Sequence, residues 1–205
     1  EYTHNKRLNM RYGMRLSTFS NIGGTEYTYI KNAETNEPIP SLTSADSFTN
    51  GEFYNTYVGL EPRASISYNL ASTLALKASY NRTFQYIQQA TNTASAFPTD
   101  QWFSVNKNIK PQRADQVAIG LFKNFDIGLE TSMEIYYKWM DQQIDYRDNA
   151  QIAFNENLDG ELLLGKGWAY GAEFYIAKTA GKSTGFLSYT WAKTMREIEG
   201  ISGGN

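Results

Sequence analysis

The feature that most constrains this chain is a two-residue alternation of apolar and polar side chains. In residues 7–18, for example, Leu, Met and Tyr fall on one face and Arg, Asn and Gly on the other. A helix repeats about every 3.6 residues and cannot keep such a pattern on one face, so the alternation predicts β-strands. The sequence thus predicts about seven strands. They span residues 7–18, 57–70, 74–81, 116–125, 129–139, 170–177 and 187–192.

The lengths and faces of these strands favour a membrane setting. Several strands approach the length that a tilted strand needs to cross a bilayer, about 10 residues. Strands of soluble sandwiches are shorter, and their polar faces are usually rich in charge. Here one face carries almost no charge in mid-strand, whereas the other mixes charges with Gly, Ser and Ala. One face suits lipid and the other a watery lumen.

The predicted connections alternate in length along the chain. Short turns are expected at about 69–73, 124–128 and 179–184, and long loops at about 20–53, 82–113 and 141–167. In an up-and-down meander every second connection lies at the same end, so the short turns share one end and the long loops the other. Outer-membrane barrels place periplasmic turns and extracellular loops in this way. We therefore predict an all-β fold in which residues 1–205 are part of one antiparallel, up-and-down transmembrane β-barrel domain.

Composition excludes several classes of function. The sequence has 19 Lys and Arg and 21 Asp and Glu, so it lacks the excess of positive charge that binding of a nucleic-acid backbone requires. Cysteine is absent and His4 is the one histidine, which argues against thiolate chemistry, zinc sites and a His-dependent triad. The sequence contains no run of about 18 apolar residues, which a membrane-spanning helix would need. We expect no nucleic-acid partner, no cofactor and no catalysis.

Acidic residues offer two weaker interpretations. Glu130 and Glu134 have a spacing that a hydrolase with paired carboxylates could use, but a wet lumen lacks the dry environment that its acid needs. We therefore expect ordinary lumen charges and no metal site. A loose calcium site nevertheless stays open as an alternative to a solvated acidic loop. Its ligands would come from Asp145, Asp148, Glu156, Asp159 and Glu161.

Several segments resemble the barrel region of TonB-dependent outer-membrane receptors. They are ASYNRTFQYI at 78–87, PTDQW at 98–102, NIKPQRADQ at 108–116, YYKWMDQQIDY at 136–146 and GKGWAYGAE at 165–173. The similarity runs from about residue 54 to the end, in the right order and at spacings compatible with strands. The resemblance implies a large barrel of about 22 strands, in which an N-terminal plug fills the lumen and TonB pulls on a short N-terminal segment.

About seven strands do not close a barrel of that size, and an open sheet edge is not tolerated in lipid. We therefore expect the chain to be an internal segment of a receptor, with the plug and the TonB-contacting region outside it. The implied function is import of a scarce or large nutrient across the outer membrane of a Gram-negative bacterium. The implied partners are outer-membrane lipid, the rest of the same receptor, TonB and a surface lipoprotein.

Two sets of side chains are candidates for contact with the cargo. Polar residues of the strands are expected to form a lumen-facing wall, comprising Arg11, Arg15, Arg63, Lys77, Glu130, Glu134 and Glu173. Aromatic residues of the loops can stack on sugars or on apolar parts of peptides and chelates, and those considered are Phe84, Tyr86, Phe97, Trp102, Phe103, Tyr146 and Trp168. Polar residues 91–95 are expected to be flexible and to close over a ligand. Packing of the aromatics into a rigid cap is the alternative.

Two other classes of protein stay open at this point. A small closed outer-membrane barrel would have a structural or adhesive role, and it needs an eighth strand of full length. A secreted carbohydrate-binding β-sandwich would be stable in plain buffer. The nature of the cargo stays open too, because siderophore, cobalamin, oligosaccharide and peptide importers share one wall architecture.

Overall fold

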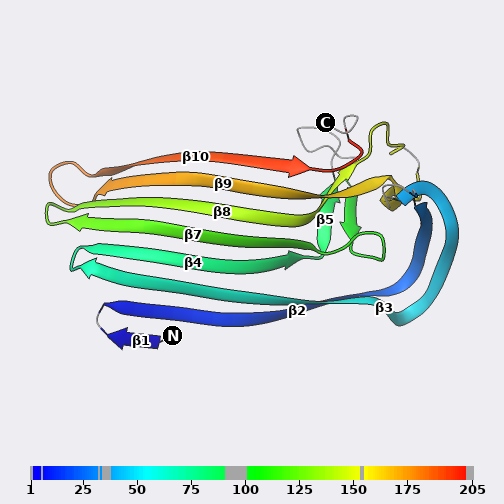
Figure 1. The fold of residues 1–205 in the computed structure, drawn as a ribbon, viewed down its shortest axis with the longest axis horizontal. Helices are drawn as coiled ribbons and strands as arrows, with labels where there is room; N and C mark the ends of the chain where they lie inside the picture. The colour runs from blue at the N-terminus through cyan, green and yellow to red at the C-terminus, as the bar shows by residue number, and fades with distance from the viewer. Residues whose placement is uncertain are drawn as a thin grey trace.

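The alternating segments form one antiparallel sheet with strand order β1-β2-β3-β4-β7-β8-β9-β10 (Figure 1). The computed structural model describes residues 2–5, 7–31, 33, 38–90, 101–152 and 155–201. The strands of the sheet are β1 Tyr2–Asn5, β2 Leu8–Lys31, β3 Pro38–Ala71, β4 Leu74–Gln85, β7 Gln112–Phe125, β8 Leu129–Tyr146, β9 Leu162–Lys178 and β10 Gly185–Glu197. The connections hold a separate two-stranded pair, β5 Ile87–Ala90 and β6 Gln101–Ser104, and the short 3-10 helix η1 Leu158–Glu161.

The prediction of an all-β, up-and-down antiparallel sheet is confirmed. Seven long strands are present, and β1 adds a four-residue strand beside β2. The short turns after β3, β7 and β9 lie together at the left of Figure 1, and the long connections lie at the right. Among the described residues the sheet is open, with β1 and β10 at its edges. No described helix is both long and apolar enough to span a membrane.

The strand register aligns the alternation of neighbouring strands across the whole sheet. Each row of cross-strand partners is therefore either mainly apolar or mainly polar. One row on the first face is apolar and consists of Met10, Ile66, Ala78, Ile119, Ile135, Ala172 and Trp191. The adjacent row on the other face is polar and consists of Asn9, Ser67, Lys77, Gly120, Glu134, Glu173 and Thr190. We call these the apolar face and the charged face.

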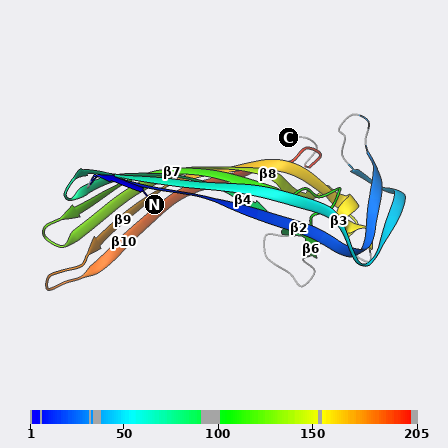
Figure 2. The same ribbon diagram turned by 90° about the horizontal axis from the view of Figure 1, so that it is seen from below.

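The strands run further into the long connections than the alternation predicts. Residues 20–53, expected as a loop, are largely a hairpin made by the ends of β2 and β3, which bends away from the sheet in Figure 2. The reason is local: the register shifts between Ile22 and Gly24, and Gly23 and Gly24 both adopt positive φ. Such a bulge breaks the two-residue period while strand pairing continues beyond it.

The densest packing of the described residues lies in the connections and not between layers of sheet. Val105 and Ile109 are almost fully buried there, as is Leu163 at the adjoining start of β9, whereas Tyr12 on the apolar face is 76% exposed. The sheet is a single twisted layer when seen from its edge (Figure 2). The alternative of a β-sandwich is therefore wrong for the described part of the chain, because no second full-length sheet covers the apolar face.

Candidate functional site

The charged face holds all seven residues predicted to line a lumen. Arg11 and Arg15 on β2 lie opposite Ser65 and Glu61 of β3. The row of cross-strand partners that includes Lys77 on β4 continues through Gly120 on β7 to Glu134 on β8 and Glu173 on β9. Among these seven residues, the basic ones lie on β2, β3 and β4 and the acidic ones on β8 and β9. The remaining two members are Arg63, which lies opposite Gly13, and Glu130, which lies opposite Asn124.

The middle of this face is a hollow of about 520 Å³ between the two groups of charge. Lys77 lies on one side, with its Nζ atom 3.9 Å from the centre of the Phe122 ring. Glu134 lies on the other side, next to the space left by Gly120. The hollow therefore presents a cation and a carboxylate to whatever occupies it.

Glu61 is a charged-face residue that the sequence analysis did not single out, and it is only 2% exposed. Its Oε2 atom lies 3.8 Å from Arg15 Nε and 3.4 Å from Arg63 Nη2, and its Oε1 atom accepts a hydrogen bond of 2.9 Å from Ser17 Oγ. Two cations and a hydroxyl thus compensate the burial of the carboxylate. The available signal is a glutamate two residues from Arg63 on the polar face of the predicted strand 57–70.

The connection between β4 and β7 folds back onto the charged face at the loop end. The Tyr86 hydroxyl lies 2.8 Å from Ser17 Oγ, on the same face of β2 as Arg11 and Arg15. Asn21 Nδ2 donates to the Val105 carbonyl at 2.7 Å, and the Tyr57 hydroxyl donates to the Asn106 carbonyl at 2.6 Å. One side of the connection is therefore fixed to β2 and β3 by polar contacts.

The other side of the same connection is fixed by apolar packing. A buried cluster joins residues from β5, the 105–109 segment, β8 and β9, namely Ala90, Ile109, Ile144, Tyr146 and Leu162. Phe103 packs against this cluster, and its ring meets that of Tyr146 edge to face at 6.4 Å between centroids. The connection thus bridges the loop ends of β2–β3 and β8–β9.

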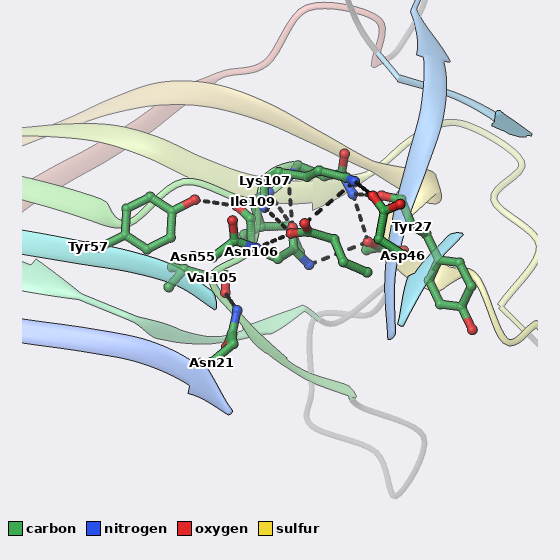
Figure 3. Close-up of polar contacts among 12 residues, drawn as sticks. Asn21, Tyr27, Asp46, Asn55, Tyr57, Val105, Asn106, Lys107 and Ile109 are labelled. Carbon is green, nitrogen blue, oxygen red and sulfur yellow. Dashed lines mark hydrogen bonds and ion pairs between the residues drawn. The ribbon is translucent and has the colours of Figure 1, made fainter. Parts of the chain in front are cut away.

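A polar network around Glu26 ties the same connection to the bent β2–β3 hairpin (Figure 3). Glu26 is 8% exposed and accepts hydrogen bonds from Asn55 Nδ2 and from the backbone N–H of Lys107, the latter at 3.1 Å. Lys107 Nζ lies 3.5 Å from Glu26 and 3.3 Å from Asp46. Asn106 Oδ1 accepts from the backbone N–H groups of residues 108 and 109, which closes the segment into a tight turn.

The third long connection joins this network through Asp159 of η1. The buried Tyr29 hydroxyl donates to the Asp159 carboxylate, and Asn108 Nδ2 donates to it at 3.1 Å. Burial raises the pKa of Tyr29 far above its usual value, and the hydrogen bond to Asp159 and the charge of that carboxylate raise it further. Gly160 packs against the Tyr29 ring, where a Cβ atom would come within 2.6 Å of Cε1. The three long connections therefore form one packed cap.

The acidic residues considered for calcium are drawn into these contacts or lie apart. Asp159 is engaged as above, and Glu161 lies 3.4 Å from Arg147 Nε. Within the described ranges, no three His, Cys, Asp or Glu side chains come together in a way that could hold a metal ion.

The aromatic candidates are divided between the cap and the sheet. Tyr86 stacks between Phe19 and Phe84, at 5.5 and 6.4 Å between ring centroids. Trp168 lies in β9, opposite Trp139 on the apolar face, and therefore apart from the other candidates. Trp102 is the one exposed member among those described, at 67%. Phe97 and residues 91–95 lie outside the described residues.

The apolar face ends in aromatics followed by ion pairs on the side of the cap. The Tyr137 ring lies 4.7 Å from Trp139 and 6.0 Å from Tyr170 between centroids. In the same cross-strand row as Trp139, Arg82 Nε lies 2.7 Å from Asp115 Oδ1. Two residues further toward the cap, Arg113 pairs with Asp141. Aromatics at this border, with charges beyond them, mark the level where a membrane-facing surface meets water.

A single twisted sheet with an apolar face bordered by aromatics, a charged opposite face and long connections gathered at one end is the wall of a transmembrane β-barrel. The chain belongs to the TonB dependent receptor-like, beta-barrel family, whose model matches residues 3–205. The resemblance found in the sequence is thereby confirmed.

Among solved structures, the chain is similar to the FrpB iron transporter from Neisseria meningitidis (F3-3 variant). The likeness has a TM-score of 0.59 at 12% sequence identity and covers 98% of this chain and 25% of that one. At this identity the likeness is one of fold, and the chain spans a quarter of the transporter's length. No curated protein matches the sequence.

Proposed function

We propose that this chain forms part of the barrel wall and of the extracellular cap of a TonB-dependent outer-membrane receptor, which imports a scarce or large nutrient. The observation that carries the proposal is the division of one sheet into an apolar face and a charged face, with every long connection packed at one end. The apolar face lies against lipid and the charged face lines the lumen. Family membership supports this assignment.

In the proposed mechanism the cap contacts the nutrient first and the charged face guides it afterwards. Trp102 offers an exposed aromatic surface on which a sugar, a peptide or a chelate can stack. Energy from TonB then displaces the plug, and the nutrient passes along a wall that presents Arg11, Lys77 and Glu134 around one hollow. The chain's own part in this is binding and transport and not catalysis.

The remaining partners follow from the same proposal. Further strands of the receptor pair with the edges at β1 and β10, because unpaired backbone groups at a sheet edge are costly in lipid. The plug and the TonB-contacting region belong to the same receptor. A surface lipoprotein that covers the cap is a further partner that the proposal leaves room for, in the outer membrane of a Gram-negative bacterium.

The cargo is a separate question, because fold does not fix function. The solved structure named above is that of an iron transporter, so chelated iron is the first cargo to test. Cobalamin, oligosaccharides and peptides are the other classes, since each can be held by aromatic and amide side chains.

Uptake by intact cells tests the proposal. Cells that carry or lack the receptor are compared for uptake of ferric siderophores, cobalamin, oligosaccharides and peptides, with TonB present or deleted. We expect one cargo to enter only when both receptor and TonB are present, with surface binding unaffected by loss of TonB. Uptake that survives without TonB, or no dependence on the receptor for any cargo, contradicts the proposal.

The mass of the native polypeptide tests the proposed place of the chain in a larger barrel. The sequence accounts for 23.2 kDa. We expect the polypeptide extracted with detergent from outer membranes to be several times heavier. A native polypeptide of about this mass would favour a small closed barrel instead.

A further inference from the structure

We propose that Tyr86 is a positioning residue, which fixes the β5–β6 hairpin on the charged face and thereby sets the orientation of Trp102 toward the nutrient. The proposal rests on the proposed function for the role of Trp102 as a contact. Its structural content concerns the anchor of the hairpin, and it is tested without any nutrient.

Tyr86 occupies a socket that is left open by the glycine at position 59. A Cβ atom at Gly59 of β3 would lie 2.5 Å from the Tyr86 hydroxyl, 2.7 Å from Phe84 Cδ2 and 2.8 Å from Ser17 Oγ. Real Cβ atoms do not approach other atoms so closely, so any other residue at position 59 forces these groups to move. Strand β3 therefore has a glycine where the connection between β4 and β7 contacts the sheet.

The hydrogen bonds in the socket have a fixed direction. Ser17 has one hydroxyl hydrogen, and it is donated to Glu61 Oε1 at 2.9 Å, because an ionised carboxylate only accepts. The Tyr86 hydroxyl therefore donates to Ser17 Oγ at 2.8 Å. Glu61 is held in turn by Arg15 and Arg63. The anchor is a chain of directed hydrogen bonds that ends in a buried, charge-compensated carboxylate.

The base of the β5–β6 hairpin connects Tyr86 to Trp102. Tyr86 directly precedes β5, and its carbonyl accepts a hydrogen bond of 2.9 Å from the Val105 N–H, which closes the base of the hairpin. Within the hairpin, Gln88 pairs with Phe103 on the buried side and Gln89 with Trp102 on the other. Rotation of the hairpin about its base would therefore exchange exposed for buried side chains. Fixing Tyr86 keeps Trp102 outward.

The functional consequence is pre-organisation. A contact residue that is already oriented loses less conformational freedom when its ligand binds, which improves affinity without a new contact. The anchor lies on the wall and not in the cap itself, so it holds the contact residue at a fixed place relative to the lumen.

The test is a distance measurement by electron paramagnetic resonance on the full-length receptor in detergent. This chain contains no cysteine, so spin labels can be placed at Trp102→Cys and at Ile127→Cys in the short turn before β8, with any cysteines elsewhere in the receptor replaced. Two variants disturb the anchor: Tyr86→Phe removes the donated hydrogen bond, and Gly59→Ala fills the socket.

Two matched controls accompany these variants. Gly13→Ala makes the same change on the charged face of β2, where a Cβ atom meets nothing within 4 Å. Tyr189→Phe removes a hydroxyl from an exposed residue on the apolar face of β10, a strand that does not pair with the hairpin.

We expect one narrow distance distribution in the receptor without these changes and in both controls. Tyr86→Phe should broaden it, and Gly59→Ala should also shift its centre. Distributions that remain unchanged in both variants, or a broad distribution from the start, overturn the proposal. Failure of the uptake experiment would instead remove the role of Trp102 and leave the anchor standing.

Discussion

Glu134 on β8 and Glu173 on β9 are direct cross-strand partners, so two carboxylates face each other on the charged face of the sheet. Like charges in this position destabilise a sheet. Arg11 and Lys77 of the same face lie across the hollow, on β2 and β4. The repulsion between Glu134 and Glu173 is thus an energetic property of the wall that mutation can measure.

A double-mutant cycle should reveal this repulsion. We expect Glu134→Gln and Glu173→Gln to show an unfavourable coupling of about 0.2–1 kcal/mol in the free energy of unfolding, because each change alone already relieves the repulsion. The measurement is chemical unfolding of the full-length receptor in detergent. The control pairs Glu130→Gln with Glu173→Gln, whose positions are not partners and should be additive. A favourable coupling would mean that a cation bridges the two carboxylates.

The glycine at position 120 is required by its neighbours on the charged face. A Cβ atom there would lie 2.6 Å from Glu134 Cγ and 3.0 Å from Phe122 Cε2. We expect Gly120→Ala to lower the free energy of unfolding by about 1 kcal/mol, at the lower end for overpacking because Glu134 can swing aside. Gly13→Ala on β2 is the control and should be neutral or slightly stabilising. Equal effects of the two changes on the unfolding temperature would contradict this account.

The bond between Tyr29 and Asp159 should make the cap sensitive to high pH. Because the pKa of Tyr29 is raised in the folded state, its contribution to stability is complete below the unfolded value of about 10 and falls as the pH rises beyond it. A fluorophore at Glu156→Cys should report release of η1 above that pH. Tyr29→Phe should abolish the dependence, and Tyr27→Phe on the same strand should retain it. Release that begins near neutral pH, or that persists in Tyr29→Phe, would assign the effect to another group.

Glu26 should be the main link between the bent hairpin and the rest of the cap. Glu26→Gln keeps the shape of the side chain but removes the charge that faces Lys107 Nζ at 3.5 Å. We expect a loss of about 1.5–3 kcal/mol in local stability, which should appear as faster protease cleavage between residues 38 and 61. Glu52→Gln is the control, because Glu52 is exposed on the same hairpin and accepts its hydrogen bonds from Thr49, three residues earlier in the chain. Similar cleavage rates for the two variants would argue against the link.

The sheet could be predicted from the sequence because its information is local. The two-residue alternation assigns each strand residue to a face, and the short turns fix the register, so the positions of Lys77, Glu134 and Glu173 on one face follow from counting. Counting along the sequence no longer assigns residues to the correct face beyond a β-bulge, because the register shifts there. Gln142 adopts a φ of 59° and the register shifts beside it, which hides the continuation of β8 to Tyr146.

The cap could not be predicted because its contacts join residues far apart in the chain. Asn21 meets Val105 across 84 positions, and Tyr29 meets Asp159 across 130. No pattern within one segment encodes such a pair. The burial of Glu61 has the same cause, since its cover comes from Tyr86, Ser17 and two arginines brought together only by the fold. Trp168 was assigned to a loop because β9 begins with an unbroken apolar run instead of an alternating one.

The packing of three connections into one cap has a mechanical consequence. A load applied to the β2–β3 hairpin passes through Glu26 to the 105–109 segment and through Tyr29 to η1, and from there into β8 and β9. Tension on one connection is therefore shared by three anchorages in the wall. Displacement of any one of the three connections therefore requires contacts with the other two to break.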